Sequence, residues 1–251
     1  MMKIWILILS MKMMTKNIGL SLFVLLVSFL IFELTPIDIA IQDFFYNFEI
    51  NEWILDKNSE VPKLIFYDGI KITYILFVIG LLLCLIFLRQ HPTIIRYKKG
   101  LVIVLLSCIV IPSFIGFLKA ITNIPCPNNI EHYNGSYPYV TVLSEYPDTF
   151  QQTGKIRCYP AGHASGGFAL MSLYFLFSRK RNRKIALTSA ISIGWVIGSY
   201  KMIIGDHFFS HTFITMILSW LLILNINYVV GHFSLQRNEK KSLTKTCTRT
   251  K

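Results

Sequence analysis

Six apolar stretches, each about as long as a membrane-spanning helix, constrain this chain more than any other feature of its sequence. They are residues 17–34, 72–88, 101–118, 162–178, 185–204 and 208–230. A helix needs about 20 mostly apolar residues to cross the hydrocarbon core of a bilayer. Only 15% of the residues are charged, against about 25% in a typical soluble domain. The sequence therefore predicts an all-α bundle of six transmembrane helices.

The charged residues divide between the two sides of the predicted bundle. The N-terminus, the loops 89–100 and 179–184 and the tail after residue 230 hold 18 of the 25 Lys and Arg residues but one of the 13 acidic residues. Basic residues near the ends of spans stay in the cytoplasm. The pattern predicts that both termini are cytoplasmic and that three loops face outward. The net charge of +12 is thus a topology signal, and nucleic-acid binding is not predicted.

The spans and their loops define one membrane-embedded domain, residues 17–232. Residues 1–16 form an N-terminal extension whose short apolar run cannot cross a membrane. Residues 233–251 form a basic cytoplasmic tail that we expect to be disordered. The first outward loop, residues 35–71, is acidic and rich in aromatic side chains. It is either an amphipathic segment on the outer membrane surface or a plain loop.

Three short segments place ionisable residues beside spans on the outward side, where such residues are costly and usually functional. We call residues 119–127, 157–166 and 200–211 the first, second and third blocks. In the second block, Pro160 suits the first turn of a helix, whose free N–H groups form an anion site near His163. In the third block, His207 and His211 are four residues apart and so share one face of a helix.

Cations accompany these histidines, namely Lys119, Arg157 and Lys201. A helix N-terminus, histidines and cations on one side of a bilayer indicate a phosphoryl-transfer site, in which one histidine attacks phosphorus and another protonates the leaving group. An alternative from the same residues is a metal site made by Asp206, His207 and His211.

The three blocks resemble the type 2 phosphatidic acid phosphatase superfamily, which also includes the vanadium haloperoxidases. The family pattern is K-x6-R-P, then P-S-G-H, then S-R-x5-H-x3-D. Here the blocks read K-x6-C-P, P-A-G-H and K-x5-H-x3-H, in the same order and spacing. Asp38 and residues 44–46 are similar to the family's amino-terminal stretch. The resemblance covers about residues 17–232.

The resemblance implies a phosphohistidine mechanism without a metal or other cofactor. It implies His207 as the nucleophile and His163 as the general acid, which later acts as the base for water. The phosphate oxygens would be held by Lys119, Lys201 and the N–H groups around Ala161 and Gly162.

The chain departs from the family pattern at four positions. Cys126 and Lys201 replace arginines, Ala161 replaces a serine, and His211 replaces the aspartate that orients the nucleophile. A neutral His211 can accept the imidazole N–H of His207. Arg157 can supply the missing guanidinium. The same departures keep open a non-enzymatic alternative, a catalytically weak lipid-binding scaffold.

Cys126 and Cys158 form a candidate disulfide. They lie in the first and second blocks, which must converge if the resemblance holds. Both are on the outward side, where thiols are oxidised in a bacterium with a periplasm. Cys84 and Cys108 lie in predicted spans, where we expect them to pack as small apolar residues.

The amino-acid sequence of the second block, together with Cys126 and Pro127, is similar to that of the bacterial branch of the family. This implies a lipid phosphatase in the bacterial inner membrane with its active site facing the periplasm. Lipid A, the lipid part of lipopolysaccharide, or another envelope saccharolipid is the first candidate substrate, ahead of undecaprenyl diphosphate and phosphatidylglycerol phosphate. Transfer of the phosphate to another lipid alcohol stays open. The phosphorylated lipid is the only partner implied, and no obligate protein partner is inferred.

Overall fold

The computed structural model describes the backbone of residues 2–249, with side chains for residues 15–66, 68–233 and 236. The chain is mostly helical. Its elements in chain order are α1 (Met2–Leu34), α2 (Ile37–Gln42), η1 (Asp43–Phe45), β1 (Tyr46–Asn47), β2 (Glu52–Trp53), α3 (Glu60–Lys63), η2 (Leu64–Gly69), α4 (Ile70–Phe87), α5 (Pro92–Ile121), η3 (Pro127–Asn129), η4 (Glu131–Tyr133), α6 (Gly162–Ala169), η5 (Leu170–Phe175), α7 (Lys180–Ile203) and α8 (Phe209–Arg249).

Within the described residues, four helical segments are long and apolar enough to cross a membrane by length and composition. They are Thr15–Leu34, Glu60–Phe87, Pro92–Ile121 and Phe209–Phe233. These segments coincide with the first, second, third and sixth predicted spans. The mostly helical, membrane-type fold is therefore confirmed.

The fourth and fifth predicted spans are also helical but do not reach the same length and apolar character. The fourth is α6, of eight residues, continued by the tighter 3₁₀ helix η5. The fifth is α7, which interleaves Ser, Thr and Gly with its apolar residues and holds Lys201 near its end. The count of six crossings remains a prediction.

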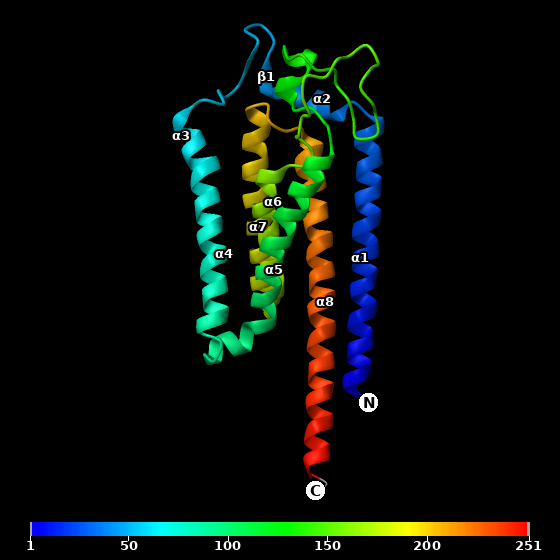
Figure 1. Cartoon of the computed structure of the whole chain (residues 1–251), viewed down its shortest axis with the longest axis vertical. Helices are drawn as coiled ribbons and strands as arrows, with labels where there is room; N and C mark the ends of the chain where they lie inside the picture. Colours follow the sequence, from blue (N-terminus) through cyan, green and yellow to red (C-terminus); the bar gives the residue numbers. More distant parts are fainter. Residues whose placement is uncertain (1, 250–251) are drawn as a thin grey trace.

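The long helices run roughly along one axis (Figure 1). At one end lie α2, the small β-hairpin and the long loop between α5 and α6. At the other end α1 begins, α8 ends and the chain turns from α4 into α5. The three blocks therefore gather at the end opposite the chain termini, as the charge pattern predicts.

The buried core lies among α5, α6, α7 and α8. Ile111, Ile115, Phe168 and Ile223 are completely buried there. α6 and α7 approach so closely that a Cβ atom added to Gly167 would lie 2.7 Å from the Cα atom of Gly194. Small residues permit such close helix contacts in membrane proteins, and this contact fixes where α6 begins relative to α7.

The outer faces of α1 and α4 carry large apolar side chains that are mostly exposed. Phe23 is 63% exposed and Leu76 is 63% exposed, and both have many apolar neighbours along their helices. Soluble monomers rarely expose contiguous apolar patches of this extent. The faces fit contact with lipid tails.

The chain ends differ from what the sequence predicts. α1 runs without a break through the residues predicted as an N-terminal extension. The tail was expected to be disordered, but α8 continues through it as helix to Arg249. Residues 233–249 contain no Gly or Pro, and eight of these 17 residues are Lys, Arg, Gln or Leu, which are good helix formers. A polar, basic composition disfavours burial in a core, but it does not disfavour helix formation.

The first outward loop packs onto the protein, and we call residues 35–60 the cap. β1 and β2 pair antiparallel, with Tyr46 opposite Trp53. The Trp53 ring covers Gly205 of the third block, where φ is +75° and an added Cβ would lie 2.3 Å from the ring. Only glycine fits both the backbone conformation and the contact. The cap thus holds the loop that carries His207, while Phe44 remains 80% exposed.

Candidate active site

The third block brings two histidines together where α7 meets α8. His207 precedes α8 and His211 lies in its first turn, and each is 2% exposed. Their Nδ1 atoms are 3.4 Å apart, within reach of a hydrogen bond. The ring of His211 also donates a hydrogen bond to the backbone carbonyl of Cys158. His211 is therefore held from two sides and contacts His207 directly.

His163 faces His207 from the first turn of α6, with their ring centroids 6.3 Å apart. Its side chain is exposed, in contrast to that of His207. Lys119, in the last turn of α5, extends to the same place, since a Cβ atom added to Gly162 would lie 4.0 Å from its Nζ atom. The end of α5, the start of α6 and the third block therefore meet at one point.

Lys201 reaches the site but is already ion-paired. Its Nζ atom lies 2.8 Å from Oδ2 of Asp206, and the lysine is only 5% exposed. Oδ1 of Asp206 lies 3.2 Å from Nζ of Lys57 and accepts a hydrogen bond from Nδ2 of Asn128 at 3.2 Å. One carboxylate thus joins the cap, the first block and the third block. It also offsets part of the positive charge that the sequence assigned to phosphate binding.

Burial and the neighbouring cations set the charges of the third-block loop. Burial raises the pKa of the Asp206 carboxyl, but Lys201 and Lys57 lower it more, so that it lies below its usual value. Burial, followed by the neighbouring His211 and Lys119, lowers the pKa of His207 well below its usual value. Asp206 is therefore charged and His207 neutral at pH 7, and a neutral imidazole is the form that can attack phosphorus.

The start of α6 offers fewer phosphate donors than predicted. The N–H group of Ala161 donates to Oγ1 of Thr215 at 2.9 Å and to the carbonyl of His211 at 3.2 Å. Ala161 is fully buried, so its N–H group serves to dock α6 on α8. The sequence assigned this group to phosphate, but the donors at the helix start must come from Gly162 onward.

The first and second blocks run side by side. Thr122 Oγ1 donates to the carbonyl of Tyr159, and the N–H of Cys158 donates to the carbonyl of Ile124 at 3.2 Å. Cys126 and Cys158 are joined by a disulfide, with their Cα atoms 5.3 Å apart. That separation lies within the normal range for a bridged pair.

We expect the Cys126–Cys158 bond to be present in the purified protein. A separation of 32 residues predicts that closing this loop stabilises the fold by about 3–4 kcal/mol in the chain-entropy model. Mass spectrometry of unreduced, alkylated digests should show the linked peptides and a labelled Cys84 as the internal control. Free alkylation of both Cys126 and Cys158 would rule out the bond.

Arg157 is exposed next to this disulfide. The charges that act on His163 are those of Lys201, Lys119, Asp206 and Lys71, and Arg157 is not one of them. Among the described contacts, nothing ties Arg157 to the histidines. Its assignment to phosphate therefore rests on the sequence.

Four further residues at the site were not predicted from the sequence to be functional: Lys57, Lys71, Asp38 and Gln42. Lys57 and Lys71 are two of the three lysines in a mainly acidic outward loop, Lys63 being the third, and that contrast was the signal available for them. Gln42 gives no local signal, because its role depends on a contact made far along the chain.

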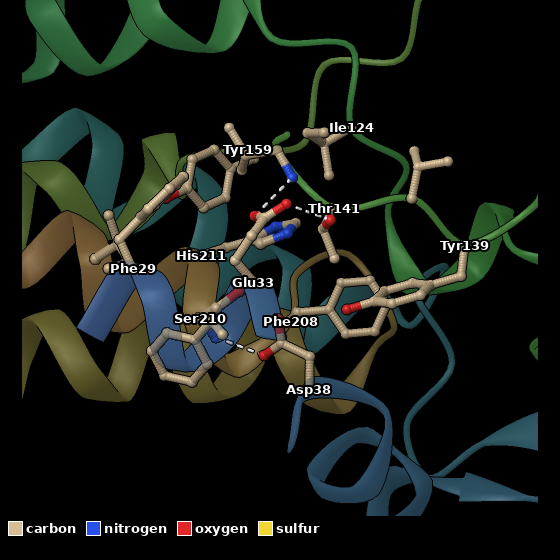
Figure 2. Close-up of a pocket in the computed structure, with 14 residues that line it drawn as sticks. Phe29, Glu33, Asp38, Ile124, Tyr139, Thr141, Tyr159, Phe208, Ser210 and His211 are labelled. Carbon is tan, nitrogen blue, oxygen red and sulfur yellow. Dashed lines mark hydrogen bonds between the residues drawn. The ribbon is translucent and has the colours of Figure 1, made fainter. Parts of the chain in front are cut away.

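A small pocket lies on the far side of His211 (Figure 2). It is formed by the end of α1, by α2, by residues 139–142 and by the start of α8. Glu33 binds the rim loop by accepting hydrogen bonds from Thr141 and from the N–H of Leu143. Its lining takes Ile124, Tyr159 and His211 from the three blocks but does not include Lys119, His163 or His207.

No group of three or more His, Cys, Asp or Glu side chains among the described residues is arranged to hold a metal ion. Asp206, the third member of the metal site that the sequence left open, is bound to Lys201 and Lys57.

Comparison with known proteins gives one match. A model of the PAP2 superfamily matches residues 100–234, which is more than half of the chain and includes all three blocks. No curated protein and no solved structure matches the chain.

Proposed function

Because this chain belongs to the PAP2 superfamily, we propose that it is an integral membrane phosphatase that removes a phosphate from a lipid through a phosphohistidine intermediate. Membership supports phosphatase activity on phosphorylated lipids. The observation that carries the proposal is the meeting of His163, His207 and Lys119 at the start of α6. A nucleophile, a proton donor and a cation at one anion-binding helix end are the parts that phosphoryl transfer needs.

In the first step, Nε2 of His207 attacks phosphorus while His163 donates a proton to the leaving oxygen of the lipid. The P–O bond breaks, a P–N bond forms and the lipid alcohol departs. In the second step, His163 takes a proton from water, whose oxygen attacks phosphorus and displaces His207. Inorganic phosphate is released and both histidines return to their starting states.

His211 would take the place of the family's aspartate. Its Nε2–H is directed at the carbonyl of Cys158, which leaves Nδ1 as an acceptor for Nδ1–H of His207. The nucleophilic Nε2 atom of His207 then carries a lone pair. A neutral acceptor stabilises the developing charge on His207 less than a carboxylate does, so this substitution favours a slower enzyme.

The phosphate oxygens would be held by Lys119, by N–H groups from Gly162 onward and by Lys201, once phosphate competes with Asp206 for it. Exposed Arg157 would meet the outer part of an anionic headgroup. Nothing in this scheme uses a metal, so activity should persist in EDTA.

We assign the substrate to lipid A or a similar envelope saccharolipid in the outer leaflet of a bacterial inner membrane. The aromatic cap beside the site and the apolar faces of α1 and α4 support a membrane-anchored substrate. Undecaprenyl diphosphate is the alternative, as is transfer of the phosphate to another lipid alcohol.

The proposal includes six membrane crossings with both termini in the cytoplasm. A reporter enzyme that is active only outside the cytoplasm should work when fused after Asn128 and should fail after Arg181. The reason is the split of basic residues, 18 to 7, between the two sides. The reverse pattern would place the site inside and remove outer-leaflet lipids from the substrates.

The decisive experiment is phosphate release by the purified protein in detergent with EDTA. The panel would hold lipid A, undecaprenyl diphosphate, phosphatidylglycerol phosphate and phosphatidic acid, at pH 5 to 8. Release from one of them identifies the substrate. Absence of release from all of them would favour the scaffold alternative, which the pairing of Lys201 with Asp206 independently motivates.

A further inference from the structure

α2 places two polar side chains in the protein interior. Asp38 is 4% exposed and Gln42 is completely buried. They are four residues apart, so they lie on one face of the helix. Buried polar groups need partners, and both of these find them more than 150 residues away in the sequence.

The partners are the two helix ends that flank the nucleophile. Oδ1 of Asp38 accepts the N–H of Ser210 at 2.8 Å, and the Ser210 hydroxyl also binds this carboxylate. Nε2 of Gln42 donates to the carbonyl of Met202 at 2.7 Å. Ser210 is the second residue of α8, and Met202 is next to the last residue of α7.

These contacts match the needs of each helix end. The first N–H groups of a helix and its last carbonyl groups lack partners within the helix. The N-terminal end is electropositive and suits a carboxylate, whereas the C-terminal end suits an N–H donor. The Gln42 oxygen has no hydrogen-bond partner within the described residues. The amide is therefore bound through its N–H₂ group alone.

Only residues 204–208 lie between the two anchored ends, and they include His207. His211 follows Ser210 directly, and Figure 2 shows Asp38 reaching Ser210 beside it. Any tilt of α8 relative to α7 would change the position of His207 and its contact with His211.

We propose that Asp38 and Gln42 are positioning residues that together fix the nucleophile loop, residues 204–208, by binding the helix ends on both sides of it. This inference rests on the proposed function. Neither side chain touches the reacting atoms; both act through the backbone of α7 and α8.

The test compares Asp38→Leu, Asp38→Asn and Gln42→Met with Glu49→Gln, an exposed carboxylate elsewhere in the cap. Misplacing a catalytic group by about 1 Å costs on the order of 10²-fold in rate. We expect Asp38→Leu to lower kcat by about that factor and Gln42→Met by about tenfold, with KM within about twofold. Asp38→Asn, which keeps an acceptor oxygen, should retain most of kcat, and Glu49→Gln should match the wild type.

A pH profile separates positioning from a general loss of structure. Burial, opposed by the hydrogen bonds of Ser210, raises the pKa of Asp38 to about 6. Below that pH the carboxyl is protonated and, like the amide of Asp38→Asn, keeps an acceptor oxygen but loses its charge. We therefore expect kcat to fall only modestly, to about the level of Asp38→Asn, as the pH drops through 6. Asp38→Asn should remove this fall in kcat on the acidic side of the pH profile. The titratable groups that face Asp38 are Glu33, Tyr133, Tyr139, Tyr159 and His211, and Glu33→Gln controls for the other carboxylate.

A second readout needs no activity. Hydrogen–deuterium exchange of the peptide covering residues 204–211 should rise in Asp38→Leu and Gln42→Met, while peptides from α5 stay protected. Unchanged exchange in both variants, or wild-type kcat in Asp38→Leu, would overturn the inference. If the wild type released no phosphate from any lipid, the proposed function would fall and the exchange result alone would decide. If Asp38→Leu did not fold, Gln42→Met and Asp38→Asn would decide.

Discussion

His207→Ala is expected to remove essentially all phosphate release, because it removes the nucleophile while His163 and His211 serve as proton donor and hydrogen-bond acceptor. His207 is 2% exposed and its Nδ1 atom faces His211, so its other ring nitrogen is the one available for attack. The measurement is phosphate release under single-turnover conditions. Rapid acid-free quenching of the wild type with ³²P-labelled lipid should also trap a labelled protein that His207→Ala does not form.

The matched control is His91→Ala, the same change at an exposed position in the turn before α5, which should leave turnover unchanged. Vanadate resembles the five-coordinate state of phosphorus and should inhibit the wild type. Substantial turnover by His207→Ala would overturn the phosphohistidine mechanism. Insensitivity to vanadate would count against it as well.

His163→Ala is expected to lower kcat by about 10²–10⁴-fold on a lipid whose leaving group is an alkoxide, which is the usual contribution of a positioned proton donor. The loss should be much smaller for an aryl phosphate whose leaving group needs no proton. His163 lies near the cations Lys119, Lys201 and Lys71 and near the Asp206 carboxylate. A bound phosphate adds negative charge beside the ring and favours its protonated form, so substrate binding itself prepares the acid.

The comparison of leaving groups distinguishes this role from a structural one. A variant that merely misfolds would lose activity on both substrates equally. Equal losses of His163→Ala on the alkyl and aryl phosphates, with an unchanged melting temperature, would show that His163 does not act as the general acid.

Much of this molecule could be predicted from local sequence. The four most apolar spans follow from the length of uninterrupted apolar residues, because a bilayer demands that length whatever the rest of the chain does. The gathering of the three blocks at one end follows from the alternation of spans with basic and acidic loops. The closeness of His207 and His211 follows from their short spacing, although His207 precedes α8 and so does not lie on a helix face shared with His211.

Local sequence leaves the outcome open where a residue type permits two of them. A basic tail without Gly or Pro opposes burial, yet it still forms helix when it continues α8. Lys201 looks like a phosphate ligand by position, yet its charge is shared with Asp206 in the folded chain. The Ala161 N–H is expected to be free at a helix start, but it donates a hydrogen bond to Oγ1 of Thr215. In each case the outcome depends on which residues, distant in the sequence, lie beside it in the folded chain.

By itself, the sequence determined the membrane fold class, the family and the types of residue at the site, because these depend on composition, order and short spacing. The tertiary structure alone decided how the site is held. Asp38 and Ser210 are separated by 172 residues, and Gln42 and Met202 by 160. No local preference encodes such pairs. They form because the packing of α2 over the ends of α7 and α8 buries polar groups that must be satisfied.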